Sequence, residues 1–194
     1  MLAAQAPVAD ARPAPTRPGL SWEDADVVER TLRRIDRRIR SGRPAAKETV
    51  IVTERQINSF VNLSLGDRIP PEVSDLELRL RPGRLAAHAV VDLDRLKAKL
   101  PEGSGLSLLS LLSGPVPVDL RGRLEGADGM GRFELEEATV GGVGVPPSVL
   151  AQLVSLATRN AEQPAGLDIA APQPLPWTAR RVRLDAGRLL VDFR

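Results

Sequence analysis

The sequence predicts an α+β protein in which a curved antiparallel sheet, built from successive hairpins, packs on two or three helices. Three segments repeat one pattern: an alternating run, a glycine turn, an arginine and a second alternating run. The turns are centred on Pro82-Gly83-Arg84, Asp128 to Arg132 and Ala186-Gly187-Arg188. Alternation of apolar and polar residues is typical of a strand with one buried face, and glycine suits tight turns. Intervening stretches with apolar residues three and four apart predict the helices.

The first 44 residues are predicted to form two separate stretches. Residues 1–20 carry four prolines among alanines and are expected to be a flexible lead. Ala4-Gln5-Ala6 resembles the cleavage site of an export signal, and the alternative is a plain tail rich in alanine and proline. Residues 21–44 are predicted to form a basic amphipathic helix that starts at the N-cap Ser21 and stops before Pro44.

Two interpretations of that basic helix remain open. Its apolar stripe consists of Val28, Leu32, Ile35 and Ile39, and arginines occupy most of the other positions. The helix either docks on the rest of the protein with a solvated charged face, or lies on a membrane surface with the stripe toward lipid. The acidic residues in its first turn favour docking.

Residues 45–194 are predicted to form a single α+β domain. A short strand from Lys47 to Val52 leads into a capping box, Thr53 to Gln56, that starts a helix. The first hairpin follows, and its return strand is expected to run along the apolar face from Leu85 to Leu93. Another helix is predicted to start at Pro146 or Pro147, before the last hairpin.

Composition argues against catalysis, bound cofactors and nucleic acid. The chain has no cysteine, and its one histidine, His88, lies on the polar side of an alternating strand. A histidine relay or a zinc site therefore lacks its usual residues, and we expect neither an enzyme nor a metal or other cofactor. The net charge is only +2 and aromatic residues make up 3% of the chain, so a nucleic-acid partner is not expected.

One connection between the first two hairpins is unusually apolar. Residues 106–112 hold five leucines and no charge, where a polar loop is expected. The segment either fills the core as a short helix or forms an apolar lip at a cavity mouth. The expected apolar ligand contacts are Phe60, Leu106, Leu108, Leu109, Leu111, Leu112 and Leu153.

The order of elements resembles that of a known family. Thr53, Glu54, Ile57 and Asn58 at a helix start, the stretch 140–146 and the closing hairpin resemble LmeA/YpmS-type bacterial envelope proteins. These proteins are similar to tubular lipid-binding (TULIP-like) domains, in which a curved sheet wraps helices around an apolar groove. The resemblance covers about residues 48–194 and brings no catalytic residue with it.

The resemblance implies non-catalytic binding of a phospholipid or other apolar ligand, outside the cytoplasm, in the periplasm or the cell envelope. Contact with a membrane surface and with an unknown protein partner would be compatible with it. Four arginines are expected to hold a headgroup phosphate: Arg79, Arg81, Arg181 and Arg183. Solvated strand faces are the other interpretation of these arginines. The alternative function is a protein-interaction or structural envelope module with a solid core.

Overall fold

The computed structural model describes residues 12, 14–15, 17–42, 47–98, 112–159, 164–169, 171–176 and 179–193. The first half of the chain forms α1 (Trp22–Arg40), β1 (Glu48–Thr53), α2 (Glu54–Ser59), a π-helical turn η1 (Phe60–Ser64), a 3-10 turn η2 (Gly66–Arg68), β2 (Val73–Arg81), β3 (Arg84–Asp92) and α3 (Leu93–Lys97). The second half forms β4 (Pro115–Ala127), β5 (Met130–Val140), β6 (Val143–Gly144), α4 (Pro147–Ala157), β7 (Gln173–Pro174), β8 (Ala179–Asp185) and β9 (Arg188–Phe193).

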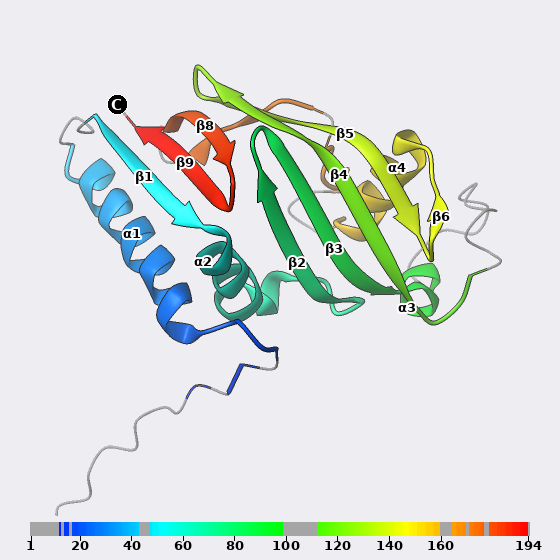
Figure 1. Cartoon of the computed structure of the whole chain (residues 1–194). Helices are drawn as coiled ribbons and strands as arrows, with labels where there is room; N and C mark the ends of the chain where they lie inside the picture. The colour runs from blue at the N-terminus through cyan, green and yellow to red at the C-terminus, as the bar shows by residue number, and fades with distance from the viewer. Residues whose placement is uncertain are drawn as a thin grey trace, which may run out of the picture.

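The described strands form one antiparallel sheet of nine strands, which confirms the predicted fold class. The order is β1-β9-β8-β4-β3-β2, and β5 pairs with the free side of β4 (Figure 1). The three predicted hairpins are β2–β3, β4–β5 and β8–β9. The long strand β4 pairs with β3 over most of its length and meets β8 only at Gly126, opposite Val182. A Cβ at Gly126 would lie 2.9 Å from the Cβ of Val182, so this junction needs glycine.

One face of the sheet is apolar across its whole width. The registers place Val52 opposite Leu189, and Leu189 opposite Leu184. Farther along the sheet, Ala87 lies opposite Leu120 in the same alternation. The helices cover this face: Figure 1 shows α1 and α2 at the β1 end and α4 at the β5 end. The opposite face carries the charged residues of the alternation and is exposed to solvent.

Local side-chain contacts explain where the helices begin. The Ser21 hydroxyl accepts a hydrogen bond from the Asp24 N–H at the start of α1. Both halves of the predicted capping box, Thr53 and Gln56, are formed at the start of α2. The structure differs from the prediction at Leu93, which begins α3 instead of extending β3. The Asp92 side chain accepts from two backbone N–H groups there and caps the short helix.

Three polar side chains on one face of helix α2 and turn η1 form hydrogen bonds with the backbone edge of β2. Leu80 N–H donates to the Glu54 carboxylate at 2.6 Å. The Asn58 amide accepts from Leu78 N–H at 2.7 Å and donates to Leu78 C=O at 2.8 Å. Asn62 donates to the Leu76 C=O at 2.8 Å. Steps of four residues on a helix span about 6 Å, and steps of two residues on a strand span about 6.8 Å. The three side chains on the helix therefore have nearly the same spacing as the three strand residues that they contact. We call these three side chains the edge clasp.

Candidate functional site

An apolar cavity of about 240 Å³ lies between α1, α2 and the β1-β9-β8 part of the sheet. Its wall consists of Val28, Thr31, Leu32, Ile35, Val50, Val52, Ile57, Phe60, Pro176, Ala179, Val182, Leu189, Val191 and Phe193. Thr31 is the one polar member of this wall, and its hydroxyl donates to the Val27 C=O within α1 at 2.9 Å. The cavity therefore offers hydrocarbon and no free hydrogen-bonding group from its wall side chains.

Helix α1 is held over the cavity by polar contacts at its first turn. Ser21 N–H donates to the hydroxyl of Ser59, a residue with no exposed surface. Asp24 is 7% exposed and forms an ion pair with Arg55 at 2.9 Å. These contacts join α1 to α2, which also supplies Ile57 to the cavity wall.

A second group of polar contacts lies near the other end of α1. The Arg34 guanidinium reaches the Glu48 carboxylate of β1 at 2.6 Å, and Arg38 reaches it at 3.4 Å. The hydrogen bond from Arg34 and the charge of Arg38 lower the pKa of Glu48 below its ordinary value, against the effect of desolvation. The same bond raises the pKa of Arg34. Helix α1 is thus attached to its neighbours near both ends, with its apolar stripe between them.

The cavity approaches the surface at Phe193, whose partner across the strands, Glu48, pairs with Arg38 in the last turn of α1. Val28 and Ile35 are each 7% exposed, but Ile39 in the last turn is 38% exposed. Phe193, at the end of β9, lines both the cavity and a surface depression that also contains Lys47 and Arg181. We call the region around Phe193 the cavity mouth.

The predicted apolar contact residues fall in different places. Phe60 lines the cavity. Leu153 is buried in a separate cluster under α3 and α4, and Leu112 packs against that same cluster. The other four leucines of the apolar connection, Leu106, Leu108, Leu109 and Leu111, lie outside the described residues. Of the predicted set, the structure therefore brings only Phe60 to the cavity wall among the residues it describes.

The four predicted headgroup arginines lie on strands β2 and β8, on the face opposite the cavity. Arg79 and Arg81 alternate with Leu78 and Leu80, and Arg181 and Arg183 alternate with Val182 and Leu184. Arg79 forms an ion pair with Glu77 at 2.9 Å that raises the pKa of Arg79, and Arg183 pairs with Asp192 at 3.3 Å. The Arg81 guanidinium donates to the Leu80 C=O at 3.2 Å. Arg181 is the one of the four that lines the depression beside Phe193.

His88 forms a pair with Asp119 on the same polar face. Its Nδ1 lies 2.8 Å from the Asp119 carboxylate, and the side chains are 41% and 55% exposed. Within the described ranges, no hydroxyl or thiol group is hydrogen-bonded to the ring. The pair orients the imidazole but lacks the nucleophile that an acyl-transfer site needs. No cluster of potential metal ligands is found in the described part of the chain.

Three comparisons with known proteins, against family models, curated sequences and solved structures, returned no match. No described helix has both the length and the hydropathy of a membrane-spanning segment.

The sequence reasoning missed most of the cavity wall. Residues such as Val50, Val182 and Val191 face the cavity because of the same alternation that was recognised in the hairpins. That alternation shows that a side chain faces the helices. It does not show whether a helix packs directly against it.

Proposed function

We propose that the protein binds a lipid or another apolar ligand in the cavity between α1 and the sheet, without catalysis. The single observation that carries this proposal is a wall of apolar side chains with empty space of about 240 Å³ between them. Interiors without a ligand function are usually close-packed, so an apolar space of this size favours a guest.

The size and chemistry of the cavity favour one hydrocarbon chain. Small-molecule sites commonly measure about 300–1,000 Å³, so this cavity suits part of one acyl chain better than a whole lipid. Each methylene that enters contributes about 0.8 kcal/mol from its removal from water. The polar end of such a ligand would remain at the cavity mouth, near Phe193, because the wall offers it no partner.

A location in the cell envelope is part of the same proposal. It rests on the resemblance of the helix start at Thr53 and of the closing hairpin to envelope lipid-binding proteins. Fractionation of cells that express the native gene would test it, with recovery in the cytoplasm as the contrary result.

Lipid mass spectrometry of the purified protein, combined with binding of a fluorescent fatty acid, tests the ligand proposal. Val50→Phe places a ring in the cavity and should abolish binding of the fatty acid. The matched control is Ile51→Phe on the next position of β1, where the side chain is 53% exposed on the opposite face. This control should bind as the wild type does.

Two results would refute the ligand proposal. One is a purified protein without lipid that also fails to bind the fatty acid. The other is equal binding by the Val50→Phe and Ile51→Phe variants, because the cavity would then not be the site. The first result would favour the interaction module with a non-binding core.

A further inference from the structure

One end of the molecule, where α1 finishes and β1 begins, gathers basic side chains. We call it the basic end; its cations are Arg34, Arg37, Arg38, Arg40, Lys47, Arg180 and Arg181, and its carboxylates are Asp36, Glu48, Asp128 and Asp192. Glu48 connects the two parts, because it pairs with Arg34 and Arg38 of α1 and lines the same depression as Lys47 and Arg181. The basic end has a formal excess of three positive charges.

The carboxylates of the basic end are already engaged. Asp36 pairs with Arg40 at 2.9 Å, Asp128 with Arg180 at 3.7 Å and Asp192 with Arg183 at 3.3 Å. Across the described residues, Arg37, Lys47 and Arg181 have no carboxylate within ion-pairing distance. Within the described ranges, three cations of the basic end thus lack a carboxylate partner, and Arg37 donates only to the Arg33 C=O at 3.4 Å.

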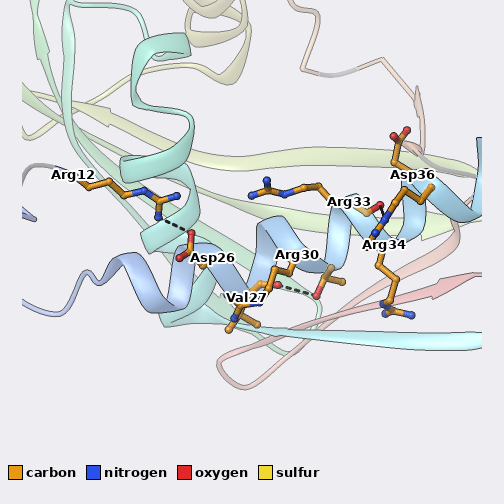
Figure 2. Close-up of a pocket in the computed structure, with 9 residues that line it drawn as sticks. Arg12, Asp26, Val27, Arg30, Arg33, Arg34 and Asp36 are labelled. Carbon is orange, nitrogen blue, oxygen red and sulfur yellow. Dashed lines mark hydrogen bonds and ion pairs between the residues drawn. The ribbon is translucent and has the colours of Figure 1, made fainter. Parts of the chain in front are cut away.

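The arginines of helix α1 point in several directions on its solvent side, and only some of them form ion pairs with the sheet. Figure 2 shows that Arg12 reaches Asp26 near the helix start and that Arg33 and Arg34 leave the helix in different directions. Arg33 forms an ion pair with Glu29 one turn earlier. The excess charge consequently increases toward the last turn of α1, which adjoins the cavity mouth.

The basic end also exposes an apolar side chain among its arginines. Ile39, 38% exposed, is flanked by Arg38 and Arg40 in the last turn of α1. Cations that surround an exposed aliphatic side chain are typical of surfaces that lie at the interface of an anionic bilayer.

Strands β4 and β5 carry a different arrangement of charges on the opposite face of the sheet. Arg123 of β4 reaches Glu136 of β5 at 2.7 Å, and Arg121 reaches Glu137 at 3.4 Å. A surface whose opposite charges are paired has little net attraction for an anionic membrane. The basic end differs from this pair of strands because three of its cations have no such partner among the described residues.

We propose that the basic end docks on the surface of an anionic lipid bilayer. Arg37, Lys47 and Arg181 meet the headgroup phosphates, and Ile39 enters the interface. This inference goes beyond ligand binding in the cavity, because it concerns a surface contact that exists whether or not the cavity is occupied. Together the two would bring the cavity mouth to the membrane.

Flotation of the full chain with vesicles tests the docking proposal. The wild type should bind phosphatidylcholine vesicles that contain phosphatidylglycerol, at low salt, and should be released at high salt because screening shortens the reach of the charges. It should bind pure phosphatidylcholine vesicles much more weakly. The combined variant Arg37→Glu, Lys47→Glu and Arg181→Glu should bind the anionic vesicles on the order of 100-fold more weakly.

A matched control reverses three exposed arginines elsewhere, with the same change in net charge. Arg68→Glu, Arg132→Glu and Arg188→Glu lie on η2, β5 and the start of β9 and have no ion pair in the described structure. This control should keep most of the vesicle binding. Ile39→Ser should weaken binding roughly fivefold, since it removes apolar area from the interface.

Four results would overturn the docking proposal. They are equal binding to neutral and anionic vesicles, equal losses in the two triple variants, an unchanged affinity of Ile39→Ser, and displacement of the protein from vesicles by inorganic phosphate at low concentration. The last result would indicate a site for a single phosphate ion. Lipid extracted from the triple variant at the basic end should match that of the wild type, which separates a failure of docking from a failure of cavity binding.

Discussion

The two halves of the apolar face are built from the same kinds of strand residue but are filled differently. Under α3 and α4, Val116, Val140, Leu150 and Leu153 belong to a buried cluster, with each of these residues less than a tenth exposed. Under α1 and α2, valines and leucines of β1, β8 and β9 surround a cavity of about 240 Å³. The strands alone therefore do not decide where this wholly apolar cavity lies.

The helices account for the difference. Helix α4 has no charged residue and contacts the sheet through leucines. Helix α1 carries eleven charged residues among nineteen and buries only part of its apolar stripe, with Ala25, Val28 and Ile35 inside. It is also bound by polar contacts at Asp24 near one end and at Glu48 near the other. Polar contacts near both ends fix the position of a helix without requiring that its apolar side chains fill all the space above the sheet.

The largest expected effect is a loss of stability in the packed half. Leu153→Ala should lower the free energy of unfolding by about 2–5 kcal/mol, because it opens a hole in a close-packed cluster. Leu32→Ala, on the half-buried wall of the existing cavity, should cost only about 1 kcal/mol. Chemical denaturation measures both, and equal losses would contradict the difference in packing.

The edge clasp is expected to matter next, since it holds α2 and therefore one side of the cavity. Asn58→Ala leaves the N–H and C=O of Leu78 without their partner and should cost about 1–3 kcal/mol. Amide hydrogen exchange at Leu78 should accelerate in this variant. Asn62→Ala is the control: the Leu76 C=O that it releases still accepts from Arg17 at 3.0 Å, so its cost should be smaller.

The same change, valine to isoleucine, should raise the free energy of unfolding in one half of the apolar face and lower it in the other. Val52→Ile adds a methyl group at the cavity wall and should raise the free energy of unfolding by about 0.5–1 kcal/mol. Val140→Ile adds the same group to the packed cluster and should lower it by about 1 kcal/mol or more. Thermal unfolding of the two variants measures the contrast, and a gain at Val140 would mean that the second half also contains space.

The smallest expected effect concerns the attachment of α1 to β1. Glu48→Gln should cost less than about 1 kcal/mol near neutral pH, because these ion pairs are partly exposed. The arginines lower the pKa of Glu48 below its ordinary value of 4.5. The contribution of Glu48 is therefore present above that value and is lost as the pH falls through the lowered pKa.

Unfolding measured in urea at neutral and acid pH checks this prediction. The difference between the wild type and Glu48→Gln should shrink as the carboxylate becomes protonated. A difference that grows in acid would show that the carboxylate is stabilised in its neutral form instead.

Much of the fold followed from local patterns. The three hairpins and the capping box at Thr53 are confirmed, since period-two alternation and side-chain caps act between neighbouring residues. The cavity could not be placed in this way. Val52 and Val140 have the same kind of pattern around them, yet Val52 lines the cavity and Val140 lies in the buried cluster. The edge clasp could not be predicted either. It joins side chains of α2 and η1 to backbone groups of β2, and nothing in the sequence of β2 indicates these partners.

The edge clasp has a consequence for how the protein behaves among its own copies. A strand at the edge of a sheet normally offers a row of unpaired N–H and C=O groups to which a strand of another chain can add. In β2 four of these groups, the Leu76 C=O, the N–H and C=O of Leu78 and the Leu80 N–H, are already bonded to side chains of the same molecule. The middle of this edge strand is thus protected from pairing with another chain, and a protein that loses Asn58 would become more prone to aggregation as well as less stable.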